Sequence, residues 1–435
     1  MFPATLGITL FLLFTVGVPI AIALGMTSVI AMHASGIPLH GIIQRMFASL
    51  DSFPLTAIPF FILAGALMEV SGISNRLINF AQSLVGRARG GLGLVAVLAA
   101  MFFASISGSS AATTAAIGAI MIPAMTARGY PKRFATSVQA SSGELGVILP
   151  PSIPMIIFAL TAGVPLSIGD LFLAGIMPGL LVAVALMMTV YIVSRRNGYG
   201  LKEAAPGTQS DGMDEIPGVW ESFRAAILPL MLPVLILGGI YGGVFTPTEA
   251  AAAAVAFAFV LGTVVFRTIN LERLMLALRT SLLNTVVILL IISSASVFGW
   301  VLTVNRIPDM VASAFIAVSD NPLIFLLLIN LLLLVVGMFI ETGAAITILA
   351  PILAPVAVAL GIDPVHFGIV MIMNLAVGMT TPPLGVNLFV ACQIASLRVE
   401  QIFKSMLPFY AALLICLIII TYVPQLSLWL PTALK

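Results

Sequence analysis

GVILPPS at residues 146–152 and GMTTPPLGVN at residues 378–387 each place two adjacent prolines inside a long apolar run. Proline lacks an amide hydrogen and frees the carbonyl groups of the preceding turn, so each pair is expected to break a helix. In hydrocarbon, unpaired main-chain groups are costly and are tolerated only where they line a cavity or bind something. We therefore predict broken helices at about 134–162 and 365–395 whose breaks belong to a binding site, with simple packing kinks as the alternative.

The composition of the 435 residues is that of a membrane protein. Hydrophobic residues make up 61% and charged residues only 8%, whereas a soluble domain has about 25% charged residues. The run 3–33 is too long for one straight crossing, and Gly17 and Pro19 at its middle favour two helices. It has neither a basic start nor a cleavage site, so we expect it to stay in the membrane. A crossing needs about 20 apolar residues, which predicts plain crossings at about 53–70, 171–194, 225–244, 247–266, 281–303 and 406–430.

The second half of the chain repeats prolines and glycines of the first half at a fixed offset. Five residues recur 232 positions later (355 − 123 for the first pair): Pro123/Pro355, Gly129/Gly361, Gly146/Gly378, Pro150/Pro382 and Pro151/Pro383. This pattern predicts two repeats, residues 1–194 and 223–435, joined by a polar cytoplasmic linker at 195–222. Internal repeats of this kind are a common construction in transporters.

Basic residues set the expected orientation, because short cytoplasmic loops carry an excess of Lys and Arg. Arg87 and Arg89 precede the apolar segment 91–127, and three basic residues follow it, so both of its ends are expected in the cytoplasm. Its arms are too short to cross, which predicts a re-entrant hairpin. The matching segment, 322–359, has no Lys or Arg in its flanks and is expected to open to the outside. The expected fold is all-α and polytopic, with two inverted repeats, each containing a hairpin and a broken helix.

Small polar residues lie at the turn of each hairpin. The first turn reads SISGSSAATT at 105–114, and the second reads FIETGAA at 339–345. Where such turns meet the proline breaks, main-chain carbonyl and side-chain hydroxyl groups can coordinate a small hard cation such as sodium. The N-termini of half-helices nearby would favour the anionic part of a substrate.

Three of these stretches resemble a known family. GSSAATTAAIGAIMIPAM at 108–125, SSGELGVILPPSIPM at 141–155 and NLAVGMTTPPLGVN at 374–387 look like the large membrane subunit of tripartite ATP-independent periplasmic (TRAP) transporters. The resemblance covers essentially the whole chain. It implies an elevator-type secondary transporter of the ion transporter superfamily, in the lipid bilayer of a bacterial inner membrane. It also implies three partners: a periplasmic binding protein, the organic acid that this protein delivers, and a small four-helix membrane subunit.

The resemblance also implies site residues, and it implies sodium as the coupling ion with no cofactor. The first sodium site would use Ser107, Ser110, Gly146, Leu149 and Pro151, mainly through backbone oxygens. The second would use Gly337, Gly378, Thr381 and Leu384, with the Thr380 hydroxyl as a further candidate. The substrate would lie between them, near Ser109, Ser152, Glu341, Thr342, Pro383 and Asn387.

Several charged and polar residues allow more than one role. Glu144 departs from the neutral residue expected in the family, and a charged side chain at membrane depth costs about 2.5–3.5 kcal/mol on insertion scales. It could shape a cation site, accept a proton or face a watery crevice. We expect Glu341 to touch the site, and Glu69 and Glu249 to be interfacial or to cap helices. The histidines, including His366, are expected at the membrane interface, and the amphipathic stretches 74–87 and 307–319 along its surface.

Other classes of function fit the sequence less well. An intramembrane protease or a lipid-phosphate enzyme would need paired aspartates, an HExxH motif or an Asp-rich cluster, and none is present in a membrane segment. No basic face is dense enough for nucleic acid, and the two cysteines are too few for a disulfide framework. The nearest alternative is a stand-alone sodium- or proton-coupled anion carrier of the same superfamily. The motifs leave open whether the acid is a C4-dicarboxylate, a sialic or other sugar acid, or a keto acid.

Overall fold

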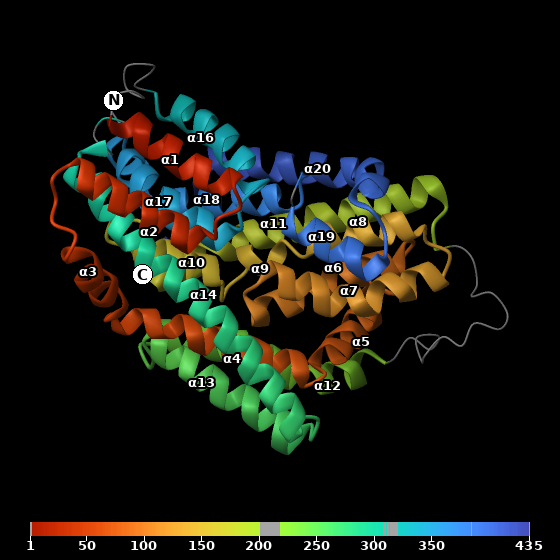
Figure 1. The fold of residues 1–435 in the computed structure, drawn as a ribbon. Coiled ribbons are helices and arrows are strands. Elements are labelled where there is room, and N and C mark those ends of the chain that lie inside the picture. The colour runs from red at the N-terminus through yellow and green to blue at the C-terminus, as the bar shows by residue number, and fades with distance from the viewer. Residues whose placement is uncertain are drawn as a thin grey trace.

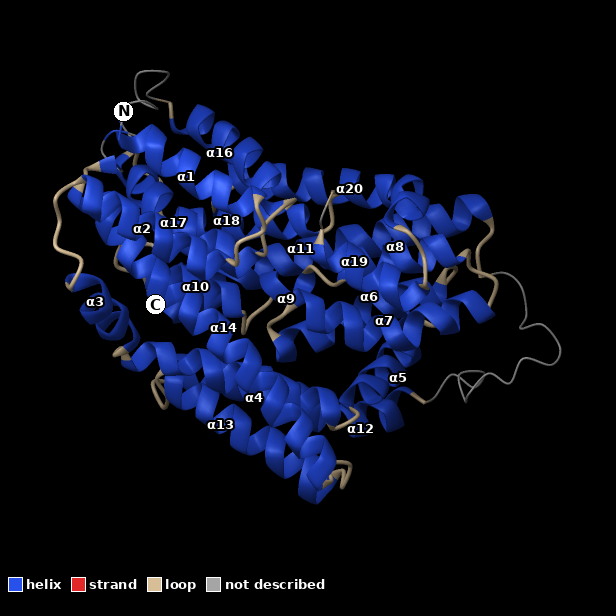
Figure 2. Ribbon diagram, viewed as in Figure 1, coloured by secondary structure: helices blue, strands red, loops and turns tan. Residues whose placement is uncertain are grey.

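The computed structural model describes residues 2–200, 218–307, 310, 313, 321–383 and 385–434. This described part is built from helices and loops (Figure 2). Eight of its helices are long and apolar enough to cross a membrane, or nine if a bent pair counts as one span. The all-helical, multi-pass architecture expected from the sequence is therefore present.

The N-terminal apolar run forms two helices, α1 (Phe2–Thr15) and α2 (Ile20–Ala34). The break falls at Gly17, whose φ of +83° suits a residue without a side chain, immediately before Val18 and Pro19. The sequence did not predict α3 (Gly41–Leu50), which packs with α2 on the long helix α14 (Leu271–Val304).

Four further helices form one edge of the molecule together with α14 (Figure 1). After a short 3₁₀ turn (Phe53–Thr56), α4 (Ala57–Val70) packs on α13 (Pro247–Val260) and α14, and α12 (Val219–Tyr241) packs on α13 and α5 (Ile73–Val85). We call α2, α3, α4, α12, α13 and α14 the scaffold helices.

Both ends of α13 have a defined local structure. A π-helical turn (Leu261–Val265) ends the helix. A capping box begins it: the Thr246 amide donates to Glu249 Oε2 at 2.8 Å, and the Glu249 amide donates to Thr246 Oγ1 at 3.3 Å. The capping role expected for Glu249 is confirmed.

A pair of helices lies at each segment where the sequence predicts a hairpin. The first pair is α6 (Gly91–Ser107) followed by α7 (Ser110–Ala127), and the second is α16 (Pro322–Gly337) followed by α17 (Thr342–Ala359). The second helix of each pair, at 18 residues, is among those long and apolar enough to cross a membrane, so the expectation that both arms of the first hairpin are too short to cross was wrong. The arms of each hairpin pack on each other. The amphipathic helix α5 leads into the first hairpin, and its Arg76 guanidinium lies 3.7 Å from the Phe266 ring centroid, beyond the end of α13. The other predicted amphipathic stretch, 307–319, lies largely outside the described residues.

Both proline pairs interrupt helices as expected. The first break separates α8 (Lys132–Ser142) and α9 (Leu145–Ile148) from α10 (Ile153–Thr161), with a bend of 44°. The second separates α18 (Pro364–Met379) from α19 (Val386–Ala395), and the Pro-Pro peptide bond is cis at both breaks. Segments far apart in the chain meet here, because α19 packs on α7 and α8 while α18 packs on α9 and α10.

Three expectations about the remaining segments were wrong or incomplete. The run 406–430 is not one helix: α20 (Val399–Tyr422) ends before Pro424, and α21 (Gln425–Ala433) follows. The crossing expected at 171–194 is longer, because α11 runs from Ile168 to Asn197. The predicted linker shortens accordingly, and its residues 201–217 lie outside the described part. His366, near the start of α18, is buried, with Nδ1 2.7 Å from Ser427 Oγ and Nε2 3.2 Å from Thr421 O.

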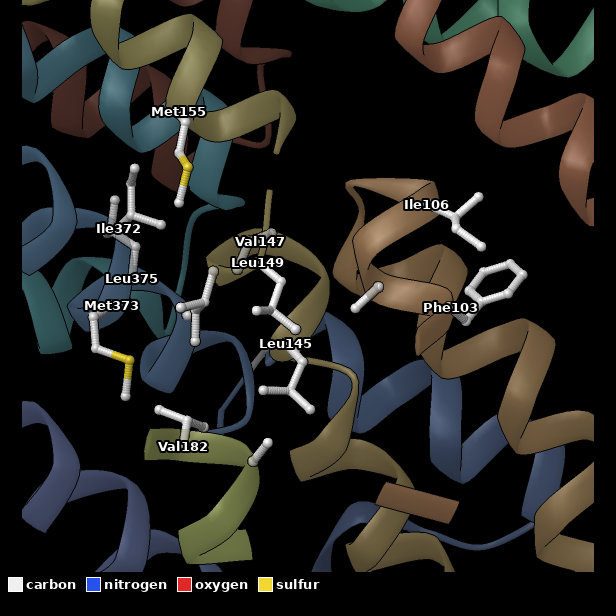
Figure 3. Packing of buried hydrophobic residues seen from close by; sticks show 14 of the residues in the cluster. Phe103, Ile106, Leu145, Val147, Leu149, Met155, Val182, Ile372, Met373 and Leu375 are labelled. Atoms are coloured by element: carbon white, nitrogen blue, oxygen red, sulfur yellow. The ribbon is translucent and has the colours of Figure 1, made fainter. Parts of the chain in front are cut away.

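The main hydrophobic core surrounds the first break. Figure 3 shows Leu145, Val147 and Leu149 of α9 and its break between Phe103 and Ile106 of α6 and Ile372, Met373 and Leu375 of α18. Both cysteines are buried, as expected.

The backbones of α16 and α18 meet directly at two glycines, since a Cβ on Gly378 would lie 2.5 Å from the Gly337 carbonyl carbon. The second hairpin can therefore pack on α18 only because both positions are glycine.

We predict that Gly378→Ala destabilises the protein by about 1–3 kcal/mol, because the added methyl group overlaps the backbone of Gly337. Thermal unfolding in detergent measures this change. Gly238→Ala in α12 is the matched control: a Cβ there meets nothing within 4 Å, and alanine is the better helix former. Equal melting temperatures for the two variants would contradict the close contact.

Candidate functional site

The first hairpin turns at Gly108, whose φ is +63°. Ser109 caps α7, since the Ala112 amide donates to Ser109 Oγ at 3.4 Å. The hydroxyl oxygens of Ser107 and Thr113 lie 2.9 Å apart, and Thr113 Oγ1 also donates to Ser109 O at 2.8 Å. The tip is thus held by its own small polar residues, which is the reason for the run of serine and threonine in the sequence.

This tip lies directly on the first proline break. The Ile153 amide donates to Gly108 O at 3.3 Å, and a Cβ on Gly108 would lie 2.6 Å from Pro151 O. A Cβ on Gly146 would overlap Ser109 O. Within the break, Ser152 Oγ donates to Val147 O at 2.7 Å. Contact at this distance between two irregular backbones requires glycine at both sides.

The second tip meets the second break in the same manner. The Gly385 amide donates to Met338 O at 3.4 Å, and Gly337 lies against Gly378. Met379, the last residue of α18, contacts both hairpin tips. Its sulfur accepts from Thr342 Oγ1 at 2.7 Å and from Ser110 Oγ at 3.8 Å. Both tips and both breaks therefore come together at one place.

The threonines of the second break use their hydroxyls locally. Thr380 Oγ1 and Thr381 Oγ1 donate to Val377 O at 2.8 and 2.9 Å, and the Thr381 amide donates to Gly378 O at 2.8 Å. Tyr410 Oη of α20 donates to Thr380 O at 2.6 Å. Leu384, the remaining residue expected here, lies outside the described residues.

A cavity of about 450 Å³ opens beside the tips, between them and the scaffold helices α4 and α14. We call it the tip cavity. Of the residues that the sequence singled out, the structure places Ser107, Ser109, Ser110 and Glu341 along it. Gly146, Leu149 and Pro151 are buried at the first break, and Gly337, Gly378 and Thr380 at the second, where Thr381 is partly exposed.

Four residues expected near the substrate do not line the tip cavity. Ser152, Thr342 and Asn387 are fully buried. Pro383 is exposed and lines a separate hollow next to α19 and α20. The structure thus gathers part of the expected substrate set at the tips and disperses the rest.

The scaffold contributes polar residues that sequence reasoning missed. Thr280 and Asn284 of α14 and Glu69 of α4 line the tip cavity. Glu69 was expected only to cap a helix or lie at the interface. The available signal was the spacing of Thr280 and Asn284, one helical turn apart, which places both on one face.

A second cavity, of about 560 Å³, lies farther along α14 and is lined by its residues Ser296, Gly299 and Thr303 and by Arg306, which follows the end of α14. Thr347 of α17 lines both cavities. Their charges differ. The described lining of the tip cavity contains two carboxylates and no basic side chain, whereas that of the second cavity contains Arg306 and no carboxylate.

Glu144 pairs with Asn387 across the two breaks. Asn387 Nδ2 donates to Glu144 Oε1 at 2.6 Å, and both side chains have 0% exposure. Glu144 therefore does not face a watery crevice. Among the described residues no group of three His, Cys, Asp or Glu side chains could hold a metal ion. The tips and breaks carry many main-chain carbonyl and side-chain hydroxyl oxygens, atoms that suit a small hard cation.

Comparisons with known proteins give a consistent result. Residues 7–426 match the family described as tripartite ATP-independent periplasmic transporter, DctM component. The C4-dicarboxylate TRAP transporter large permease DctM of Rhodobacter capsulatus is 39% identical, with 98% of each chain covered. The sialic acid TRAP large permease SiaM of Vibrio cholerae is 40% identical, with 95% of each covered.

A fused relative and a solved structure extend the comparison. The isethionate TRAP permease DctMQ of Oleidesulfovibrio alaskensis is 42% identical over 96% of this chain, which spans 64% of that longer protein. The crystal structure of the Alcanivorax borkumensis YdaH transporter superposes with a TM-score of 0.64 at 18% identity, covering 91% of this chain and 89% of that one. At this identity the likeness shows the fold alone.

The second tip yields a testable prediction. Glu341 caps α17, because the Ala344 amide donates to its Oε2 at 3.1 Å. Glu341→Ala should lower the free energy of unfolding by about 1 kcal/mol, whereas Glu341→Asp, which retains a capping carboxylate, should cost less. Thermal unfolding of the two variants in parallel measures the difference. An alanine variant as stable as the wild type would exclude the capping role.

Proposed function

This chain belongs to the DctM component family of tripartite ATP-independent periplasmic transporters, and from that premise we propose that it imports an organic acid by sodium-coupled secondary transport. It would act in the bacterial inner membrane as the large permease. A periplasmic binding protein would deliver the acid, and a small four-helix subunit would brace the scaffold. Relatives named for C4-dicarboxylate, sialic acid and isethionate transport all handle small organic anions, which supports this substrate class.

One observation carries the proposal: two hairpin tips and two broken helices meet around Met379, next to the tip cavity. Each break interrupts a helix within the apolar core, so its main-chain carbonyls are the available ligands for an ion. The first sodium ion would sit between the first tip and its break, near Ser110 and Gly146. The second would sit near Gly378 and Thr381, and the acid would bind in the tip cavity next to Ser109 and Glu341.

The two cavities along α14 support movement of this site. We propose that the two hairpins and broken helices, as inverted repeats, slide as one unit past the scaffold helices. Asn284 lines the tip cavity and Thr303 lines the second cavity on the same helix, and 19 residues separate them (303 − 284), about 28 Å of helix. The α14 residues that line the cavities between them are mostly apolar: Val287, Ile288, Ile291, Ile292 and Ala295. An apolar stretch between the two polar cavities would be the barrier to leakage of the acid and of ions.

Sodium can supply the energy for such transport. A tenfold sodium gradient is worth about 1.4 kcal/mol per ion, and a membrane potential of about 100 mV adds about 2.3 kcal/mol per net charge moved. Two ions would therefore concentrate a charged acid by several orders of magnitude without ATP.

Reconstitution tests the coupling. In proteoliposomes with the small subunit and the binding protein, Ser110→Ala and Thr381→Ala should each raise the half-saturating sodium concentration about fivefold, the equivalent of about 1 kcal/mol of lost binding. Thr432→Ala in α21, whose hydroxyl bonds only within its own helix, is the control and should leave the sodium response unchanged. An unaltered response in both site variants would remove the site assignment.

The same assay tests the tripartite arrangement. Uptake measured against a panel of dicarboxylates, sugar acids, keto acids and sulfonates should require the binding protein for every transported acid. Uptake at the full rate without the binding protein would instead identify a stand-alone carrier.

A further inference from the structure

Glu144 and Asn387 form a buried contact between the two halves of the chain, 243 positions apart. Glu144 lies immediately before α9, and Asn387 is the second residue of α19. The contact uses one carboxylate oxygen, Glu144 Oε1, and the amide nitrogen of Asn387. Glu144 Oε2 and Asn387 Oδ1 have no hydrogen-bond partner among the described residues. Two oxygens that can only accept are thus left without donors in one buried pair.

Among the described residues, no basic side chain pairs with the Glu144 carboxylate. The Tyr410 hydroxyl of α20 donates to Thr380 O instead. The charged side chains at the starts of the packed helices α8 and α20 are exposed: Lys132, Arg133, Glu400 and Lys404. A fully buried carboxylate without a positive partner is unfavourable, and either a proton or a cation can neutralise it.

The surroundings provide oxygen atoms rather than nitrogen or sulfur ligands. Thr114 Oγ1 lies against Gly143, where a Cβ would overlap it, and this hydroxyl is fully buried without a partner. Gln139 Oε1, one turn before Gly143, also lacks a donor. Carboxylate, amide and hydroxyl oxygens together favour a small hard cation over a transition metal.

We propose that Glu144 Oε2 and Asn387 Oδ1 bind a sodium ion, in a bridging site separate from the two sites at the hairpin tips. The inference rests on the proposed sodium-coupled function and adds one ion to it. The ion would connect the end of α8–α9 to the start of α19, so it would hold the two broken helices in register as they move. Its binding would therefore depend on the relative position of the two breaks.

Sodium binding to the purified full chain tests the proposal. The number of ions per chain is measured with radioactive sodium at equilibrium. Glu144→Gln keeps the size of the side chain and the contact with Asn387 but removes the charge, and it should bind one ion fewer than the wild type. Glu272→Gln, an exposed carboxylate at the start of α14, is the matched control and should bind the wild-type number. Asn387→Asp, which supplies a second carboxylate, should retain the ion.

The outcomes separate this inference from the proposed function. A wild-type ion count in Glu144→Gln overturns the bridging site and leaves the tip sites intact. If that variant does not fold, Asn387→Ala removes Oδ1 together with the Nδ2 that donates to Glu144, and an unchanged ion count there overturns the proposal equally. Ser110→Ala should weaken binding of a tip ion about fivefold while leaving the bridging ion unchanged. A wild-type chain that binds no sodium overturns both the bridging site and sodium coupling.

Discussion

Main-chain groups outside regular helices need hydrogen-bond partners or bound ions when they lie within a membrane. In this protein each hairpin tip packs on a proline break and accepts a hydrogen bond from it. Glycine makes this possible on both sides. Gly108 and Gly146 let the first tip reach its break, and Gly337 and Gly378 let the second hairpin touch α18. A side chain at any of these four positions would separate the two backbones. The cavity, the cluster of hydroxyls and the meeting of the two halves at Met379 all follow from these contacts.

The scaffold gives this site two different environments. One face of α14 lines both cavities, with Asn284 at one and Thr303 at the other, where Arg306 beyond the helix end also lies. Under the proposed movement, the tips would leave a cavity that contains carboxylates and reach one that contains a guanidinium. An anion would then meet its only basic partner among the described lining residues at the second cavity, while the ion sites travel with the tips. Under that proposal, the difference in charge would give the two ends of the path distinct roles in loading and release.

Much of the architecture could be predicted because prolines and glycines leave strong local signals. The offset between Pro150 and Pro382 located both breaks, and Gly17 separated α1 from α2. Signals within uniform apolar runs were weaker, so the break before Pro424 was missed. Contacts over long sequence distances left no signal at all. Neither the pairing of Glu144 with Asn387 nor the burial of His366 against Ser427 can be predicted from periodicity or spacing.

The movement of the tips past α14 is tested most directly by a reversible cross-link. A Cβ on Gly299 of α14 would lie 3.8 Å from Pro351 Cβ of α17, a separation that suits a disulfide. Gly299→Cys with Pro351→Cys should abolish uptake when oxidised and recover it on reduction. Gly25→Cys with Ser294→Cys, which joins two scaffold helices where a Cβ on Gly25 would lie 3.9 Å from Ser294 Oγ, should leave uptake unchanged. Transport at the wild-type rate by the oxidised Gly299–Pro351 pair would contradict the movement.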